Sequence, residues 1–307
     1  MPRASAIADL WLRYAFGMLA GVVSVNGRIT SAAEAVVPVF DHGFVYGEGV
    51  YETLRTYRRE PFEFAAHMAR LRRSAEMIAL PVPMSDADLR AEVDRTAAAY
   101  AGSAGAAAEE FYIRLLLTRG VGDLSYSLAA TPAPTLVVII KPLKPFPAAN
   151  YTNGIKVALV DIRRNHVTAL NPLIKSNNLL NNALAMQEAY RRGADEAVML
   201  NQDGQVTECS QSNMFVVTHG ALATPPLSAG LLPGITRQVV LALAARLGIP
   251  GGDRQLSAAD VINADEVFIT STTREITPVT SIDSAAVGSG VPGPVTQRLM
   301  AAFRANC

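Results

Sequence analysis

The sequence is short of the residues that mark several common classes of protein. Only two of its 307 residues are cysteines, Cys209 and Cys307, so a disulfide scaffold is excluded and a reducing cytoplasm is expected. Acidic and basic residues balance at 27 each, which argues against a nucleic-acid or anionic-membrane partner held by net charge. No apolar run approaches the length of a membrane span. These absences leave an ordinary soluble globular protein.

Candidates for metal or thiol chemistry are equally scarce. The four histidines lie far apart and none falls in a ligand spacing, so no metal site is expected. Cys209 has no histidine near it in the sequence, which favours a buried, inert thiol. The Gly47-x-Gly49 pair leads into a strand pattern, which indicates a tight turn and not a dinucleotide-binding loop.

Composition and periodicity divide the chain into four parts. Residues 1–20 are interpreted as an N-terminal extension, because Asp9 and Arg13 interrupt any signal-peptide core and a clean strand pattern follows Met18. Residues 21–141 predict a small domain, the proline-rich segment 142–153 a linker, and residues 154–307 a larger domain. Strands and helices are mixed without a strict βαβ rhythm, so the predicted class is α+β in two domains.

Lysine is the scarcest charged residue, with only four among the 27 basic residues, and one of them stands in an unusual place. Lys175 lies in "NPLIKSNNLLNN", at the start of a helix predicted over residues 177–193. No acidic residue occurs between Asp161 and Glu188. A snorkelling surface lysine is the ordinary interpretation of such a position. Without a carboxylate nearby in an apolar setting, the pKa of a lysine falls, and its amine can form an imine with a carbonyl compound.

Two further segments of the larger domain could bind an anion. In "LLPGITRQVV", Ile235 and Thr236 begin an amphipathic helix whose first amides are free to bind phosphate, although a Pro-Gly turn before a helix is equally common. In "TSTTREITPV", hydroxyl groups gather in a predicted loop after a strand. An imine-forming lysine and two phosphate-binding segments together suggest pyridoxal phosphate, which also needs a carboxylate at its ring nitrogen. Glu208, at the end of a short predicted strand, could supply it.

The chain resembles the class IV aminotransferases, which are the fold-type IV pyridoxal-phosphate enzymes. The resemblance covers roughly residues 20 to 305, and its specificity comes from the order of seven motifs along both predicted domains. It implies a D-amino-acid-aminotransferase-like fold, with a smaller α/β N-terminal domain and a larger C-terminal domain built on a mixed sheet or barrel. The motifs are "DHGFVYGEGVYETLR", "HMARL", "YIRLLLTRGVGDL", "NPLIKSNNLL", "VTECSQSNMF", "LPGITR" and "TSTTREITPV".

The resemblance assigns a role to each matching cofactor residue. It makes Lys175 the lysine that holds the cofactor and shuttles the proton, and Glu208 the partner of the ring nitrogen. Arg70 matches the arginine that binds the cofactor phosphate, which the residues alone could not distinguish from its neighbours. Ile235, Thr236 and Thr272 match further phosphate ligands.

The substrate positions point to one subfamily with two departures from it. Tyr112 and Arg114, in "YIR", match the branched-chain enzymes, in which the tyrosine helps bind the α-carboxylate and the arginine binds the distal carboxylate of glutamate. Tyr46 and Tyr51 match aromatic positions of the substrate pocket. Thr272 and Thr273 match positions whose backbone amides receive the substrate α-carboxylate. The Arg-x-His pair of the D-amino-acid enzymes is replaced by Leu124 and Tyr126. Leu180, however, stands where branched-chain enzymes commonly have a tyrosine, "TSTTREITPV" resembles the D-amino-acid form, and "TEC" resembles the lyases.

The resulting prediction is a pyridoxal-phosphate-dependent aminotransferase with ping-pong kinetics. It exchanges amino groups between amino acids, with branched-chain L-amino acids favoured, and 2-oxoglutarate. The alternatives are a D-amino-acid or (R)-amine transaminase, an aminodeoxychorismate-lyase-like enzyme, and a non-catalytic protein that keeps the fold. The resemblance also implies a homodimer or higher homo-oligomer.

Overall fold

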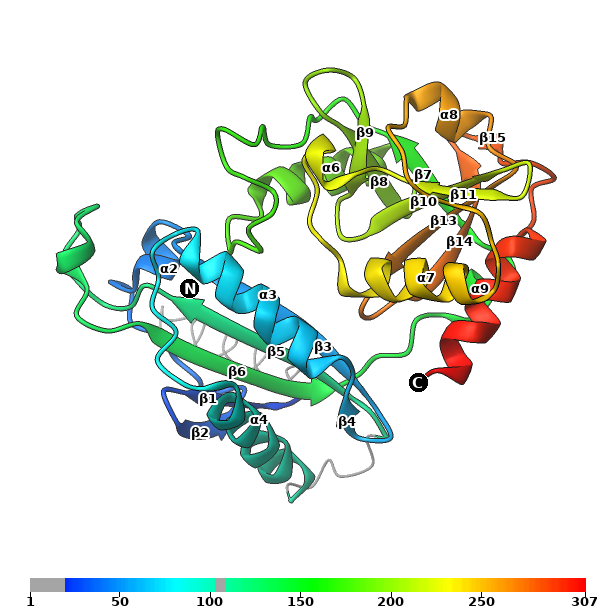
Figure 1. Cartoon of the computed structure of the whole chain (residues 1–307). Coiled ribbons are helices and arrows are strands. Elements are labelled where there is room, and N and C mark those ends of the chain that lie inside the picture. Colours follow the sequence, from blue (N-terminus) through cyan, green and yellow to red (C-terminus); the bar gives the residue numbers. More distant parts are fainter. Residues whose placement is uncertain (1–19, 103–108) are drawn as a thin grey trace, which may run out of the picture. The chain divides into compact units, whose positions relative to one another are not determined.

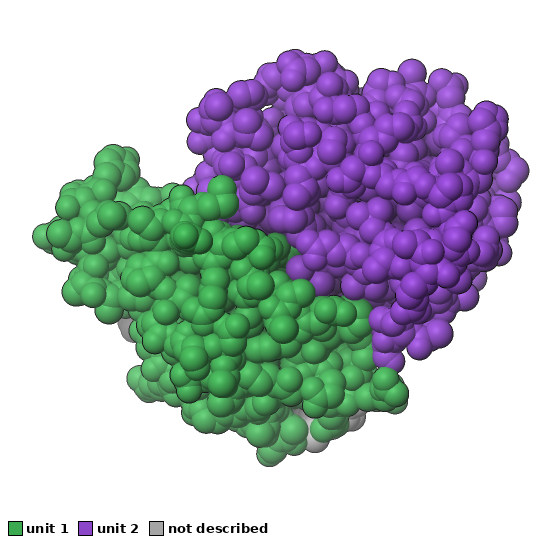
Figure 2. Space-filling view, viewed as in Figure 1, with its two compact units in different colours: residues 1–144 green, residues 145–307 purple. Residues whose placement is uncertain are grey.

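The computed structural model describes residues 20–102 and 109–307, and the chain divides into two compact units (Figure 2). Unit 1 is Met1–Lys144 and unit 2 is Pro145–Cys307, so the boundary falls within the proline-rich segment 142–153. Of the predicted N-terminal extension, only Ala20 lies among the described residues. No helix in the described part of the chain is both long and apolar enough to span a membrane.

Unit 1 is built on a six-stranded sheet in which all neighbouring strands are antiparallel (Figure 1). The order across the sheet is β2-β1-β6-β5-β3-β4. Asn26 and Gly27 form the first turn with positive φ angles, as is typical of an Asn-Gly pair. The strands are β1 (Val22–Val25), β2 (Arg28–Ser31), β3 (Gly49–Tyr57), β4 (Glu60–Pro61), β5 (Phe111–Thr118) and β6 (Thr135–Pro142).

Two long helices cover one face of this sheet, and the other face carries polar and aromatic side chains. In β3 and β5 buried and half-buried residues alternate, which is the pattern of strands with one covered face. Glu52 faces α3, and Ser24 of β1 bonds to Glu92 of α4, so both helices lie on the same side. A capping box between Ser85 and Asp88 begins α4. The helices are α2 (His42–Val45), α3 (Phe64–Glu76), α4 (Asp86–Ala101) and a 3-10 turn (Leu128–Ala130).

Unit 2 contains a nine-stranded mixed sheet that curls into a half-barrel (Figure 1). Its order is β12-β11-β10-β13-β14-β7-β8-β9, with β15 paired to β14, and β7 is parallel to both of its neighbours. The strands are β7 (Ile155–Leu159), β8 (Glu196–Leu200), β9 (Val206–Cys209), β10 (Asn213–Thr218), β11 (Ala221–Thr224), β12 (Gly251–Asp253), β13 (Glu266–Ser271), β14 (Glu275–Ile282) and β15 (Ala285–Ala286).

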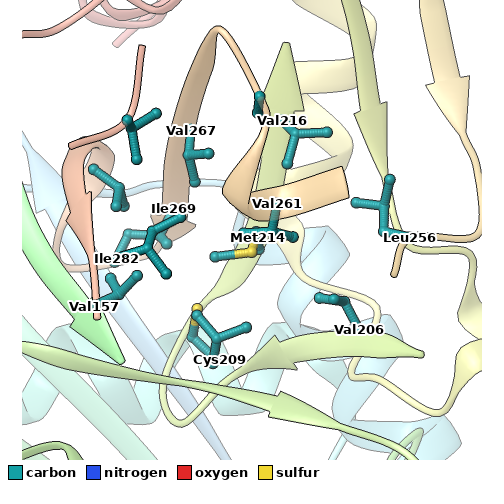
Figure 3. Packing of buried hydrophobic residues seen from close by; sticks show 14 of the residues in the cluster. Val157, Val206, Cys209, Met214, Val216, Leu256, Val261, Val267, Ile269 and Ile282 are labelled. Carbon is teal, nitrogen blue, oxygen red and sulfur yellow. The ribbon is translucent and has the colours of Figure 1, made fainter. Parts of the chain in front are cut away.

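The core of unit 2 consists mainly of β-branched side chains from this sheet. Figure 3 shows Cys209 among them, together with Met214, so the thiol belongs to the core as predicted. Pro294 is the first residue of the closing helix, a position that suits proline because its missing N–H would have no partner within the helix. The helices of the unit are α5 (Ala148–Thr152), α6 (Leu180–Arg191), α7 (Ile235–Arg246), α8 (Ala258–Ile262), α9 (Pro294–Ala305) and a 3-10 turn (Leu227–Ala229).

The α+β class and the two-unit architecture agree with the sequence prediction, while two local predictions were wrong. The helix predicted over 177–193 begins only at Leu180, and Lys175 lies in the loop before it, as expected. The segment "TSTTREITPV" is not a loop, because only Thr272, Thr273 and Arg274 form a turn and strand β14 begins at Glu275. In both cases polar residues at the end of an element hid its true boundary.

Candidate active site

A buried carboxylate lies at the end of β9 in unit 2. Glu208 is 5% exposed, and Arg164 donates from Nε to its Oε1 atom at 2.8 Å. Its Oε2 atom accepts hydrogen bonds from the Leu232 amide at 3.1 Å and from Asn213 Nδ2 at 3.3 Å. Burial raises the pKa of Glu208, and Arg164, the Leu232 amide and Lys175 offset this only in part. The site thus holds a carboxylate that would gain from another positive partner.

Lys175 belongs to the same region as Glu208. It is half-buried in the loop that precedes α6, and its positive charge is among those that lower the pKa of Glu208. No carboxylate lies near Lys175 along the sequence, but the fold brings Glu208 within range of its charge. The amine and the carboxylate lie within electrostatic range of each other, as a site that binds one ligand with both groups requires.

Asn213, the first residue of β10, joins three chain segments around Glu208. Its Nδ2 atom donates to Glu208 and, at 2.9 Å, to the Leu232 carbonyl just before α7. Its backbone pairs with Thr270 near the end of β13. A Cβ at Gly234 would lie 1.9 Å from Asn213 Oδ1, so only glycine fits there. The end of β9, the start of α7 and the end of β13 consequently meet at one place.

The start of α7 and the turn after β13 offer donors for an anion. Gly234 is the N-cap of α7 and no side chain caps this helix, so the first-turn amides, including those of Ile235 and Thr236, are available as donors. The side chains of Ile235 and Thr236 are buried and fix the first turn against the unit. Thr272 and Thr273 form the half-buried turn between β13 and β14.

Three of the substrate residues predicted in unit 1 lie on the face of its sheet opposite α3 and α4. Thr53 of β3 pairs with Arg114 of β5, which places Tyr51, Tyr112 and Arg114 on one side of two adjacent strands. The Arg114 guanidinium lies 4.1 Å from the centre of the Tyr51 ring. Arg114 Nη1 is 3.5 Å from the Tyr112 hydroxyl. Together these residues present a guanidinium and two phenols to a ligand.

Tyr46 lies at the end of α2, where it packs against two other rings. The centre of its ring is 5.0 Å from that of His42 and 5.1 Å from that of Tyr126. Tyr126 stands in one of the two positions that carry Arg-x-His in D-amino-acid enzymes. The other, Leu124, is 61% exposed. The loop 121–128 therefore supplies aromatic and apolar surface here, and no cation.

Arg70, the predicted phosphate ligand, is held by a buried carboxylate in unit 1. Its Nε and Nη2 atoms donate to the two oxygens of Glu52, each at 2.7 Å, and His67 Nδ1 lies 2.7 Å from Glu52 Oε2. Burial by itself would raise the pKa of Glu52, but the attraction of Arg70 and His67 outweighs it and lowers that pKa far below the ordinary value. Glu52 is therefore a fixed negative charge that orients the guanidinium.

The predicted site residues thus form two groups. Lys175, Glu208, Ile235, Thr236 and Thr272 belong to unit 2, where contacts through Asn213 connect Glu208, the start of α7 and the end of β13. The substrate tyrosines, Arg114 and Arg70 belong to unit 1. Arg164 and Asn213 were not predicted as site residues, because each contacts Glu208 only in the folded chain and no local motif indicates the contact.

Two other potentially reactive features do not belong to the site. Burial, with the charges of Glu196 and Glu208, raises the pKa of the Cys209 thiol well above its ordinary value, so the thiol is inert. Within residues 20–102 and 109–307, no group of three or more histidine, cysteine, aspartate or glutamate residues is placed to hold a metal ion.

A buried carboxylate beside a lysine, next to a helix start with available amides, defines a site for an anionic cofactor that reacts with an amine. Comparison with known proteins identifies the family. The sequence model of the family "Amino-transferase class IV" matches residues 49–282, and the chain belongs to this family. It is therefore an aminotransferase of the fold-type IV class, as the motifs predicted.

Individual relatives cover nearly the whole chain. D-alanine aminotransferase of Bacillus licheniformis is 34% identical over 92% of this chain and 95% of its own length. The crystal structure of the Escherichia coli branched-chain amino acid aminotransferase superposes with a TM-score of 0.87 at 31% identity, covering 94% of each chain. The branched-chain amino acid aminotransferase of T.th., complexed with N-(5'-phosphopyridoxyl)-L-glutamate, gives a TM-score of 0.84 at 28% identity, covering 93% of each chain.

Proposed function

We propose that this aminotransferase uses pyridoxal 5'-phosphate to exchange amino groups between branched-chain L-amino acids and 2-oxoglutarate. The observation that carries the proposal is the placement of Lys175 within electrostatic range of Glu208, a buried carboxylate with a raised pKa. The solved relatives that are branched-chain aminotransferases favour this substrate class over the D-amino-acid, (R)-amine and lyase alternatives.

The residues of unit 2 fit the cofactor by the chemistry of their donors. Lys175 would hold the aldehyde carbon through its amine, and Glu208 would accept a hydrogen bond from the protonated ring nitrogen. That nitrogen supplies the positive partner that the raised pKa of Glu208 calls for. The amides of Ile235 and Thr236, with Thr272, would bind the phosphate, and Arg70 of unit 1 would add a charged donor.

The protein residues then perform simple tasks around the cofactor. When bound, pyridoxal phosphate supplies a ring that takes up the electron pair of the broken Cα–H bond. Once the amino donor has displaced it from the cofactor, Lys175 would carry the proton from Cα of the donor to the cofactor's C4′ carbon, and in the second half-reaction it would carry a proton from C4′ to Cα of the product. Glu208 keeps the ring nitrogen protonated. Because the first product leaves before the second substrate binds, ping-pong kinetics follow.

The resemblance gives substrate-binding roles to residues of each unit. The α-carboxylate would accept hydrogen bonds from the amides of Thr272 and Thr273 and from the Tyr112 hydroxyl. Arg114, stacked on Tyr51, would pair with the distal carboxylate of 2-oxoglutarate or glutamate. Tyr46 and Tyr51 would line the pocket for a branched apolar side chain.

The exposed apolar surface of unit 1 supports a homodimer. Large apolar side chains of residues 36–45 and 121–128 are exposed, and these two segments bond to each other at Asp41 and Val121. Exposed apolar surface of this kind marks interaction sites, and a second copy of the chain is the partner that the resemblance implies. We place the enzyme in the cytoplasm, since neither of its two cysteines is in a disulfide. Sedimentation of the wild type should show a dimer, and Phe44→Glu, at a 74% exposed position, should shift it toward monomer.

A panel of amino donors tests the substrate assignment. L-leucine, L-valine, D-alanine and (R)-1-phenylethylamine are each offered with 2-oxoglutarate and with pyruvate, and initial rates are measured. The proposal predicts the highest kcat/KM for the L-branched donors with 2-oxoglutarate, with parallel double-reciprocal lines. Preference for D-alanine would reverse the substrate assignment, and pyruvate released without an acceptor would reveal a lyase.

A further inference from the structure

A second buried carboxylate of unit 2 takes no part in the site described so far. Glu196, the first residue of β8, is fully buried, yet it accepts hydrogen bonds from several donors. Ser210 donates both its amide, at 3.1 Å, and its hydroxyl, and the Ser212 hydroxyl lies 3.2 Å away. Arg274 Nη1 donates to Oε2 at 2.8 Å. A buried carboxylate that accepts hydrogen bonds from so many donors holds those partners in place.

The partners of Glu196 come from two segments that flank proposed ligands. Ser210 and Ser212 follow Glu208 at the end of β9, and the loop they form returns the chain into Asn213. Arg274 directly follows Thr272 and Thr273 in the β13–β14 turn. One carboxylate thereby ties the loop beside the ring-nitrogen partner to the turn beside the substrate carboxylate.

The β13–β14 turn is one that needs such support. Glu275, which closes it, has a φ of 55°, a left-handed conformation that costs a non-glycine residue free energy. The Arg274 carbonyl accepts a hydrogen bond from Thr277 Oγ1 at 2.8 Å, and the Arg274 guanidinium lies 5.5 Å from the centre of the Phe146 ring. Contacts of the Arg274 carbonyl and of its guanidinium therefore fix the residue that precedes the strained Glu275.

We propose that the Glu196–Arg274 ion pair is a positioning device that sets the place of the Thr272 and Thr273 amides relative to Glu208. The pair determines how tightly the substrate carboxylate binds, and it takes no part in moving the proton. The inference rests on the roles proposed above for Thr272 and Thr273. Arg274 and Glu196 are positioning residues, since they act through the turn and through the Ser210–Ser212 loop.

The test compares Arg274→Met and Arg274→Lys with a matched control, Arg304→Met. Arg304 Nε lies 3.4 Å from Oε2 of Glu275, the residue that follows Arg274, in a part-buried contact, so its loss removes a neighbouring ion pair that does not include Glu196. Backbone amide hydrogen exchange of peptides covering 271–276 and 209–213 is measured in the full chain, with and without added pyridoxal phosphate. KM and kcat for leucine and 2-oxoglutarate are measured alongside.

Arg274→Met should speed exchange in both peptides by about tenfold or more, because losing a charged hydrogen bond is worth at least one factor of ten in local opening. KM for both substrates should rise by a similar factor of about ten, with kcat within about twofold. Arg274→Lys should bring both the exchange rates and KM most of the way back to wild type. Arg304→Met should change neither the exchange rates nor KM. If Arg274→Met does not fold, Arg274→Gln takes its place.

Unchanged exchange in the 209–213 peptide would overturn the inference, because the two segments would then not be coupled through Glu196. A fall in kcat with KM unchanged would also overturn it. The exchange measurement does not need transamination, so an inactive wild type would sink the proposed function while leaving the coupling of the two segments open to this measurement. A wild type that transaminates as proposed, with an Arg274→Met variant of unchanged exchange and KM, would contradict only the inference about the ion pair.

Discussion

Each unit contains a buried glutamate paired with an arginine, and the two pairs behave in opposite ways. In unit 1, burial opposes the charge of Glu52, but Arg70 and His67 outweigh burial and lower the pKa of Glu52 far below its usual range. In unit 2, burial raises the pKa of Glu208, and Arg164, the Leu232 amide and Lys175 do not fully offset it. Both carboxylates are almost completely buried, so exposure does not explain the difference.

The difference separates a structural ion pair from a ligand-binding one. Glu52 has both of its oxygens engaged by Arg70, so the pair is complete within the protein and serves to orient that arginine. Glu208 is left short of positive charge, and a protonated ring nitrogen would supply it. The raised pKa of Glu208 therefore identifies it as the carboxylate of unit 2 at which a positively charged ligand group would be stabilised.

The largest effect is expected at Lys175. Lys175→Ala should lower kcat by about 10²–10⁴-fold, since a positioned acid–base group contributes that much. Lys156→Ala, at an exposed position of β7, is the matched control and should keep wild-type turnover. An equal loss of kcat in the two variants, measured by steady-state kinetics at saturating cofactor, would show that Lys175 is not the catalytic lysine.

The next effect separates the two arginine–glutamate pairs. Arg70→Ala should weaken cofactor binding by about 1.5–3 kcal/mol, the worth of a charged hydrogen bond, and reduce kcat modestly when cofactor is saturating. Glu208→Gln should do the reverse and keep the cofactor while losing turnover. Cofactor Kd is measured by equilibrium dialysis and kcat by initial rates. If both variants lost only cofactor affinity, the role of Glu208 would be wrong.

A selective effect is expected at Arg114. Arg114→Leu should raise KM for 2-oxoglutarate by about tenfold or more, because the distal carboxylate loses a charged partner worth roughly 1.5–3 kcal/mol. KM for leucine, whose side chain has no charge, should change little and serves as the internal control. Equal increases for both substrates would assign Arg114 to the α-carboxylate or to folding.

The smallest effect concerns pH and stability, and it has opposite signs in the two units. The lowered pKa of Glu52 means that its contribution to stability is present above about pH 4.3, the unfolded pKa, and is lost as pH falls toward its folded pKa. The raised pKa of Glu208 means that its native state takes up a proton first, so acidification favours folding through this group.

Urea unfolding of the cofactor-free chain at pH 7 and pH 4 checks these signs. Relative to Glu52→Gln, the wild type should lose roughly 0.5–1 kcal/mol of unfolding free energy on going to pH 4. Relative to Glu208→Gln, it should gain stability over the same step. Differences of one sign for both variants would show that the two pairs are electrostatically alike.

The sequence predicted those parts of the fold that depend on local patterns. The alternation in "FYIRLLLT" is the pattern of β5, and the Ser85–Asp88 capping box and Pro294 stand at helix starts, because each signal is set by neighbouring residues. Strand β14 was missed because its first residues, in "REIT", continue a polar turn, and its strand character comes from pairing with β13 and β7.

The candidate site was predictable only where motifs carry it. Lys175, Glu208 and Arg70 stand in ordered motifs, and the site roles given to them remain predictions. Arg164 and Asn213 could not be found, since their contacts with Glu208 depend on the folded sheet and helix start. The environment of Lys175 was misjudged for the same reason, because Glu208 reaches it through the fold and not along the chain.

Because the chain has only four lysines, the central claim can be tested at one residue. The protein is loaded with pyridoxal phosphate and reduced with borohydride, which fixes the cofactor to the amine that holds it, and the modified peptide is identified by mass spectrometry. The account predicts a yellow protein with one modified site, Lys175. A label on Lys141, Lys144 or Lys156 alone, or a protein that stays colourless and unlabelled, would contradict it.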